Sequence, residues 1–130
     1  AAGYRVTITD YDPTAVDLAL YNARQHGFDR VRGEALDWRQ PGTERYPVLL
    51  GCELLYEDRN HDLLINVCRT LLTLDGVAWF GDGGRVRAER FCRLAAAAGF
   101  DVRLFDETGS PLPALRVGRY QLIEVRPSQP

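Results

Sequence analysis

The sequence predicts an α/β fold in which a mostly parallel sheet carries helices on both faces and ends in an antiparallel pair of strands. Two observations lead to this prediction. Short runs of β-branched and aliphatic residues alternate along the chain with segments in which apolar residues recur at helical spacing. A glycine also follows each helical segment, as is typical of a helix end.

The first strand and helix set the pattern for the others. Every residue from Val6 to Thr9 is β-branched, which favours a buried extended segment. Asp12 before Pro13 is typical of an N-cap and a first helical residue. The predicted strands are Arg5–Thr9, Arg30–Glu34, a segment within Tyr46–Glu57, Val77–Gly81, Phe100–Phe105 and Tyr120–Val125. The predicted helices are Pro13–His26, His61–Leu72 and Arg87–Ala98.

Three further predictions concern packing. The consecutive apolar residues 48–50 suggest a strand that is covered on both faces. The proline-rich segment Gly109–Leu115 is too long for a two-residue hairpin, but it suits an antiparallel pair at the edge of the sheet. His26 and His61 have no evident partner in the sequence and are expected at the surface.

The composition indicates one soluble domain over residues 1–126, followed by a disordered tail over residues 127–130. The chain has 130 residues, 45% of them hydrophobic, and a net charge of −2. Its sixteen basic residues are all arginines spread along the chain, which argues against nucleic-acid binding. No apolar run approaches the roughly 18 residues that span a membrane, so a cytoplasmic location is expected. Cys52, Cys68 and Cys92 lack metal-site spacing and are expected to be buried thiols.

Acidic residues follow four successive predicted strands, at the point where each strand ends. These positions are Asp10, Asp37 with Trp38, Glu53 with Tyr56, and Asp82 with Arg85. Ligands of open α/β sheets bind at the carboxyl ends of the strands, where an acid can accept hydrogen bonds from the hydroxyls of a ribose. The sequence therefore predicts a nucleoside-binding edge.

In this order the segments TDYDPTAV, EALDW, LLGCELLYE and FGDGGR resemble the class I S-adenosylmethionine (SAM)-dependent methyltransferases, which have a Rossmann-like fold. They are most similar to the branch that contains protein lysine methyltransferases. The resemblance implies that Asp10 holds the ribose hydroxyls and that Tyr11 lies against the adenine. It also implies that Asp37 accepts from the adenine amino group and that Trp38 flanks the ring.

The same resemblance implies that Glu53 and Tyr56 form the catalytic pair, facing the methyl group and the incoming amine. Methyl transfer needs an in-line, unprotonated nucleophile, so the protein contributes mainly position and electrostatics. Asp82 and Arg85 would either line the acceptor side or pair with each other as a structural contact, and no metal is expected. The leading acceptor is a protein lysine, with small molecules as other candidates, and the oligomeric state is left open.

Three features depart from the family pattern. Glu53 stands where aspartate is more common, and Gly83 stands where the family usually has proline. A glycine-rich loop after a first strand is absent from the 130 residues. The chain is therefore expected to be the carboxyl-terminal two-thirds of a methyltransferase domain, missing its first strand and helix. By itself it is expected to bind SAM weakly or not at all.

Three alternatives stay open. A nicotinamide-dependent oxidoreductase also has an acid after its second strand, but it does not account for Asp37–Trp38 or for Glu53 with Tyr56. A phosphoacceptor receiver domain would use a lysine near its site, and the sequence contains none. A non-catalytic methyltransferase-like subunit would tolerate the substitutions at positions 53 and 83.

Overall fold

The structure is a computed structural model, and it describes residues 3–128. The chain forms two compact units, residues 1–41 (unit 1) and residues 42–130 (unit 2). Each unit has its own sheet, and each is described by itself. In residues 3–128, no helix is both long enough and apolar enough to cross a membrane.

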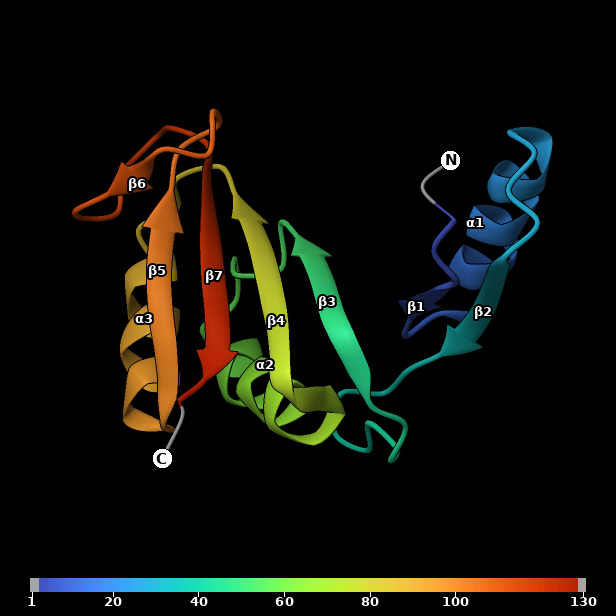
Figure 1. Cartoon of the computed structure of the whole chain (residues 1–130), viewed down its shortest axis with the longest axis horizontal. Coiled ribbons are helices and arrows are strands. Elements are labelled where there is room, and N and C mark those ends of the chain that lie inside the picture. The colour runs from blue at the N-terminus through green and yellow to red at the C-terminus, as the bar shows by residue number, and fades with distance from the viewer. Residues whose placement is uncertain (1–2, 129–130) are drawn as a thin grey trace. The chain divides into compact units, whose positions relative to one another are not determined.

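Unit 1 is a strand, a helix and a parallel strand (Figure 1): β1 (Val6–Asp10), α1 (Pro13–Gln25) and β2 (Val31–Ala35). The carboxylate of Asp12 accepts a hydrogen bond from the Thr14 N–H at 2.8 Å, which confirms the predicted N-cap. A Cβ at Gly33 would lie 2.4 Å from Cγ1 of Val16, so the glycine allows α1 to lie close to β2.

The prediction that the first strand is buried is wrong for unit 1. Val6 is 45% exposed, and Thr9 and Asp10 are also exposed. The reason is that unit 1 offers one helix, which contacts both strands and can cover only one face of the pair.

Unit 2 holds the larger sheet, whose strand order is β3-β4-β7-β5-β6. Its strands are β3 (Tyr46–Cys52), β4 (Leu72–Asp82), β5 (Phe100–Phe105), β6 (Pro111–Leu112) and β7 (Gln121–Pro127). Its helices are α2 (Asp58–Leu71) and α3 (Ala88–Ala97). The strands β3 and β4 are parallel, whereas β7 runs antiparallel to both β4 and β5. The α/β class with a mixed sheet is therefore confirmed.

The antiparallel pairing of β5 with β7 is confirmed, but its predicted place at the edge of the sheet is wrong. β7 lies between β4 and β5, and the short strand β6 from the proline-rich segment forms the edge instead (Figure 1). β7 also extends to Pro127, which belonged to the predicted tail. Gln129 and Pro130, the end of that tail, lie outside the described residues.

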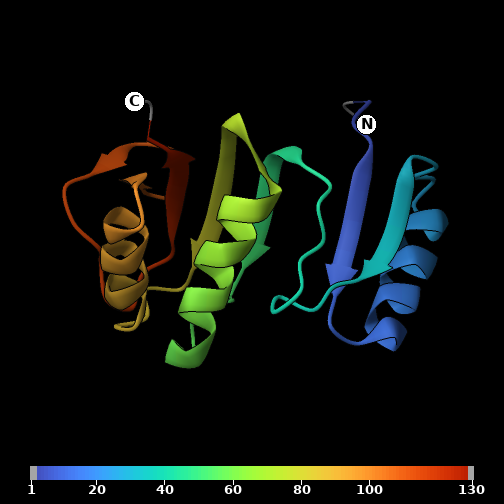
Figure 2. The same ribbon diagram turned by 90° about the horizontal axis from the view of Figure 1, so that it is seen from below.

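The core of unit 2 lies between the sheet and helices α2 and α3, which Figure 2 shows on the same side of the sheet. Phe91 of α3 is fully buried and packs edge-on against Phe80 of β4 at a centroid distance of 4.9 Å. His61 is fully buried as well, against the prediction for this residue, and its ring lies 5.8 Å from that of Phe91. Its Nε2 forms a 3.0 Å hydrogen bond with the Leu55 carbonyl, which lets the imidazole lie in the core.

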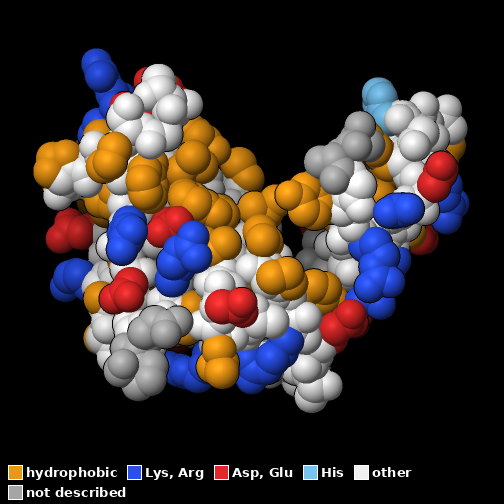
Figure 3. All heavy atoms as spheres, in the orientation of Figure 1, with side chains coloured by type: hydrophobic (Ala, Val, Ile, Leu, Met, Phe, Trp, Pro, Cys, Tyr) orange, Lys and Arg blue, Asp and Glu red, His pale blue; other side chains and the backbone are white. Residues whose placement is uncertain are grey.

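The opposite face of the larger sheet exposes apolar side chains. Leu50 is 80% exposed and Val48 is 50% exposed, so β3 is not covered on both faces as predicted. Within residues 42–128, β3 is an edge strand, and both helices lie on the other face of the sheet. Figure 3 shows the hydrophobic side chains that gather over this face.

Strand β4 follows α2 directly, so Gly76, the glycine that follows this helical segment, is not its end. Helix α2 ends at Leu71 and the strand begins at Leu72. The pairing with β3 shifts from Tyr46 opposite Leu72 to Val48 opposite Val77. Asp75 and Gly76 therefore lie in a bulge inside the strand, and regular pairing starts at Val77.

Candidate functional site

In unit 1 the predicted nucleoside-binding residues gather at one end of the sheet. Strands β1 and β2 are parallel, and Asp10 lies opposite Ala35. The Leu36 N–H donates to the Asp10 carbonyl at 2.8 Å, which continues this alignment beyond the strand. Asp10 thus ends β1, and Asp37 follows the neighbouring strand β2 at the same end of the sheet.

Arg39 connects two of these residues. Its guanidinium donates to both oxygens of the Asp37 carboxylate, from Nε at 2.9 and 3.0 Å and from Nη2 at 2.7 Å. Nη2 also donates to the Tyr11 hydroxyl at 3.3 Å, and Cζ lies 5.7 Å from the centroid of that ring. The hydrogen bond from Arg39 lowers the pKa of Asp37. Arg39 was not predicted as a site residue, and its position two residues after Asp37 was the available signal.

Asp10 and Trp38 take part in less of this network. The Oδ1 of Asp10 accepts from the backbone N–H of Asp12 at 2.9 Å, which fixes the turn into α1. Trp38 is part-exposed beside Asp37. A cavity of about 340 Å³ in unit 1 lies next to Phe28 and Val31, where β2 begins, and none of the predicted site residues lines it.

In unit 2 the four predicted residues come together at the carboxyl ends of β3 and β4. The Arg85 guanidinium donates a hydrogen bond from Nη2 to Oε2 of Glu53. Its Cζ also lies 5.6 Å from the centroid of the Tyr56 ring, within the range of a cation–π contact. A single arginine therefore touches both members of the predicted catalytic pair.

Asp82 holds the backbone that carries this arginine. Its side chain is fully buried, and Oδ1 accepts from the N–H groups of Gly84 and Arg85 at 2.8 and 2.7 Å. Its Oδ2 has no hydrogen-bond partner in the described structure, and it lies 3.9 Å from Nε of Arg85. Asp82 therefore fixes the loop after β4 rather than presenting its carboxylate to solvent.

Glu53 has an unusual backbone conformation. Its φ is +57°, in the left-handed region that side chains rarely adopt, and its N–H donates to the Gly81 carbonyl at 2.8 Å. Such conformations cluster at functional sites, where the position of one side chain outweighs the strain. A Cβ at Gly83 would lie 3.3 Å from Oε1 of Glu53. The two departures from the family pattern thus lie in contact, and the glycine leaves room for the longer acid.

Tyr120, just before β7, is a neighbour of this site that the sequence analysis did not identify. A Cβ at Gly81 would lie 2.3 Å from the Tyr120 hydroxyl, so the ring end reaches β4 only because residue 81 is glycine. Partial burial, together with the charge and hydrogen bond of Cys52, raises the pKa of Tyr120. A shallow cavity of about 280 Å³ lies beside Tyr120, Gly81 and Cys52, and it is also lined by Leu50, Trp79 and Leu122.

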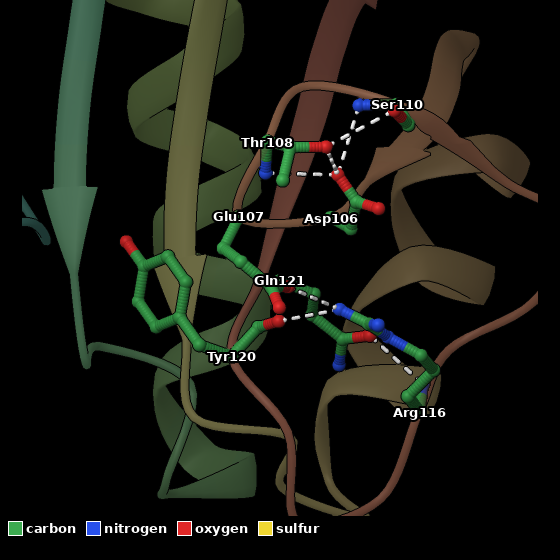
Figure 4. A network of polar contacts seen from close by, with 7 residues as sticks. All are labelled: Asp106, Glu107, Thr108, Ser110, Arg116, Tyr120 and Gln121. Atoms are coloured by element: carbon green, nitrogen blue, oxygen red, sulfur yellow. Dashed lines mark hydrogen bonds and ion pairs between the residues drawn. The ribbon is translucent and has the colours of Figure 1, made fainter.

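The connection that leads to Tyr120 is held by a polar network (Figure 4). Arg116 donates from Nη2 to the Glu107 carboxylate at 2.9 Å and to the Tyr120 carbonyl at 2.8 Å. Its backbone N–H donates to Oε1 of the buried Gln121 at 2.8 Å. The hydrogen bond from Arg116 lowers the pKa of Glu107. These bonds hold the chain where Tyr120 leads into β7.

The cysteines differ in accessibility. The prediction that all three are buried is wrong for Cys52, which is exposed, and Cys92 is only half-buried. Burial raises the pKa of Cys68 from 9.0 to about 12 and that of Cys92 from 9.0 to about 11. Since the thiolate is the nucleophile, a rise of this size for Cys68 lowers its reactive fraction on the order of a thousandfold. At pH 8 we therefore expect iodoacetamide to alkylate Cys52 first, as measured by peptide mass spectrometry.

The same labelling in urea serves as the control, because all three thiols are then accessible and should react at similar rates. A Cys52→Ser variant should leave the native chain nearly unlabelled over the same period. Native-state labelling of Cys68 as fast as that of Cys52 would contradict the burial of α2 against the sheet.

In residues 3–128, no group of three or more His, Cys, Asp or Glu side chains is arranged to hold a metal ion. The site chemistry present is that of carboxylates, guanidinium groups, aromatic rings and one exposed thiol. Such groups can accept hydrogen bonds from a nucleoside and can orient an amine.

No protein-family model and no curated protein sequence matches the chain. Solved structures do match it in fold. One is a TehB-like SAM-dependent methyltransferase from Corynebacterium glutamicum, with a TM-score of 0.71 and 22% identity over 95% of this chain and 68% of that one. Another is the magnesium protoporphyrin IX methyltransferase from Synechocystis with bound SAM, with a TM-score of 0.71 and 15% identity over 98% of this chain and 61% of that one.

A third is a ribosomal protein L11 methylase from Lactobacillus delbrueckii, with a TM-score of 0.70 and 14% identity over 95% of this chain and 57% of that one. The mitomycin 7-O-methyltransferase MmcR is covered by this chain over only 42% of its length. The chain thus spans from about two-fifths to about two-thirds of the structures that it resembles. At these identities the likeness concerns the backbone, and on that basis the chain has the fold of the class I SAM-dependent methyltransferases.

Proposed function

We propose that this chain belongs to a SAM-dependent methyltransferase that transfers the methyl group to an amine, with a protein lysine as the leading acceptor. The observation that carries the proposal is Glu53, an acid held in a left-handed conformation at the end of β3 and three residues before Tyr56. The fold shared with methyltransferases supports it. Because the chain spans only part of those proteins, the activity is proposed for the longest natural polypeptide that contains these 130 residues.

In this proposal unit 1 supplies the nucleoside contacts. Asp10 accepts from the ribose hydroxyls, and Asp37 accepts from the adenine amino group while Arg39 orients it. Tyr11 and Trp38 flank the base, since aromatic rings stack well on a heteroaromatic ring. SAM itself supplies the electrophilic methyl group, and these residues bind and orient its nucleoside.

Unit 2 supplies the acceptor side. Glu53 and Tyr56 orient the nitrogen that attacks the methyl carbon, and Arg85 sets the charge around them. The amine must lose its proton before attack, and a carboxylate beside it can accept a hydrogen bond from the N–H that remains. Asp82 keeps the loop in place through its two backbone hydrogen bonds.

The sheet topology favours this function over a nicotinamide-dependent oxidoreductase. The dinucleotide-binding sheet is mostly parallel, with the strand order 3-2-1-4-5-6. Here the reversed strand β7 is inserted between β4 and β5.

A glycine-rich turn that would contact the methionine part of SAM is proposed to lie outside the 130 residues.

The proposal is tested by transfer of radiolabelled methyl from SAM to lysine-containing peptides. Glu53→Gln is expected to lower the rate about a hundredfold, the loss typical of a misplaced acid–base group, while calorimetry shows unchanged SAM affinity. Glu57→Gln is the matched control, because this acid lies just before α2, outside the cluster, and bonds to Arg59. Equal rates for the Glu53 variant and the parent protein would refute the catalytic role.

A further inference from the structure

Arg85 occupies the position in which an amine acceptor would be expected. A carboxylate beside an aromatic face is the pair of groups that proteins use to bind ammonium and guanidinium cations. Glu53 and Tyr56 form such a pair, and the Arg85 guanidinium fills it by contacting both. The chain's own cation thus uses the contacts that the proposed function assigns to the substrate.

The backbone and the side chain of Arg85 are held very differently. The backbone N–H donates to the buried Asp82 carboxylate at 2.7 Å, so the loop is fixed. The side chains of Arg85 and Glu53 are 43% and 41% exposed, and ion pairs this accessible to water contribute little to stability. The guanidinium can therefore leave the Glu53 carboxylate without moving the loop.

The backbone of Glu53 is held in place as well. Its left-handed backbone is anchored to β4 by the 2.8 Å hydrogen bond to the Gly81 carbonyl. Gly83 lies beside its carboxylate and has no side chain to cover it. A carboxylate on an anchored backbone, an aromatic face and an exposed internal cation together make a cation site with a removable occupant.

We propose that Glu53 and Tyr56 bind an alkylammonium group, such as a lysine side chain, and that Arg85 is its built-in competitor. The ammonium takes over the carboxylate and the ring face while the Arg85 side chain swings into solvent. Arg85 thereby determines which acceptors enter. This inference rests on the proposed function for its biological meaning, but it concerns binding alone.

The test is a titration of the full chain with Nα-acetyl-lysine methylamide, in the absence of SAM. Nuclear magnetic resonance follows the amides of Glu53 and Gly83 and the ring of Tyr56. Arg85→Gln is expected to tighten binding of the probe about tenfold, since it removes one exposed ion pair and one cation–π contact from the competition. Arg85→Lys keeps a competing charge and should bind the probe as the parent chain does.

Three controls make the result specific. Arg87→Gln is the matched variant, because Arg87 is an exposed arginine two residues away that pairs with Asp58 at 2.9 Å. It should leave the affinity unchanged. The double variant Glu53→Gln, Arg85→Gln should not show the tighter binding of the single variant Arg85→Gln. The uncharged probe Nα-acetyl-norleucine methylamide should not distinguish Arg85→Gln from the parent chain.

Equal or weaker binding by Arg85→Gln would overturn the inference, since an arginine that positions Glu53 would lower the affinity when removed. The outcome is separable from that of the proposed function. If Arg85→Gln binds the probe more tightly while no variant transfers a methyl group, the methyltransferase proposal fails and the cation site stands. If methyl transfer depends on Glu53 while Arg85→Gln and the parent chain bind the probe equally, only the role of Arg85 as a competitor fails.

Discussion

Replacing Gly84 with alanine is expected to lower the free energy of unfolding of unit 2 by about 2–4 kcal/mol, from overpacking added to a left-handed backbone that alanine disfavours. Gly84 has a φ of +83°. A Cβ there would lie 2.4 Å from the Arg119 nitrogen and 2.6 Å from the carbonyl oxygens of Arg116 and Arg119. All three are backbone atoms, so a change of rotamer cannot relieve the contact. Urea unfolding followed by Trp79 fluorescence measures the loss, in a Trp38→Phe background that removes the signal of unit 1.

Gly99 provides the matched control. Its φ of +86° is nearly the same, but among residues 3–128, its two chain neighbours aside, no atom lies within 4 Å of the position that its Cβ would take. Gly99→Ala should therefore show only the conformational cost, about 1 kcal/mol. If both variants lose the same stability, the loop after β4 does not lie against residues 116–119 as described. Because that loop carries Arg85, Gly84→Ala should also abolish the difference between Arg85→Gln and the parent chain in the probe titration.

Phe91→Ala is expected to cost about 3–5 kcal/mol, the range for removing a buried aromatic ring and leaving a cavity. The side chain is fully buried, and its ring contacts Phe80 of the sheet and His61 of α2. The substitution thus empties the junction of both helices with the sheet. The same fluorescence-monitored urea unfolding reports the change as a lower midpoint with an unchanged slope.

Leu74→Ala is the control for this substitution, because Leu74 is 85% exposed and should change stability by less than about 0.5 kcal/mol. Phe91→Leu keeps most of the apolar volume, so its loss of stability should lie between those of Leu74→Ala and Phe91→Ala. A loss below about 1.5 kcal/mol for Phe91→Ala would mean that the core between α2, α3 and the sheet is not closely packed.

The secondary structure was largely predictable because its signals are local. Asp12 and Pro13 mark the start of α1, and Gly99 marks the end of α3 with a φ of +86°. The order of the strands was not predictable in the same way. Whether β7 pairs with β5 alone or also with β4 depends on contacts between residues far apart in the sequence, about which neither segment carries a local signal.

The candidate site was predictable where it follows from strand direction. Parallel strands end at the same edge, so Asp10 and Asp37 lie together in unit 1, and Glu53 lies near Arg85 in unit 2. Tyr120 was missed because it lies 67 residues beyond Glu53 in the sequence and meets Gly81 only in the folded chain. His61 was placed at the surface although it shares a helical stripe with Leu64 and Cys68, and this periodicity was the better guide.

The bulge in β4 has a consequence for how the chain tolerates changes in length. Between Leu72 and Val77 the strand contains residues that do not pair regularly with β3, so deleting one of them can shorten the bulge and leave the later register intact. Beyond Val77 the tolerance ends. One deletion there would invert every following side chain, turning Phe80 out of the hydrophobic interior and bringing its neighbour Trp79 into a space shaped for a smaller ring.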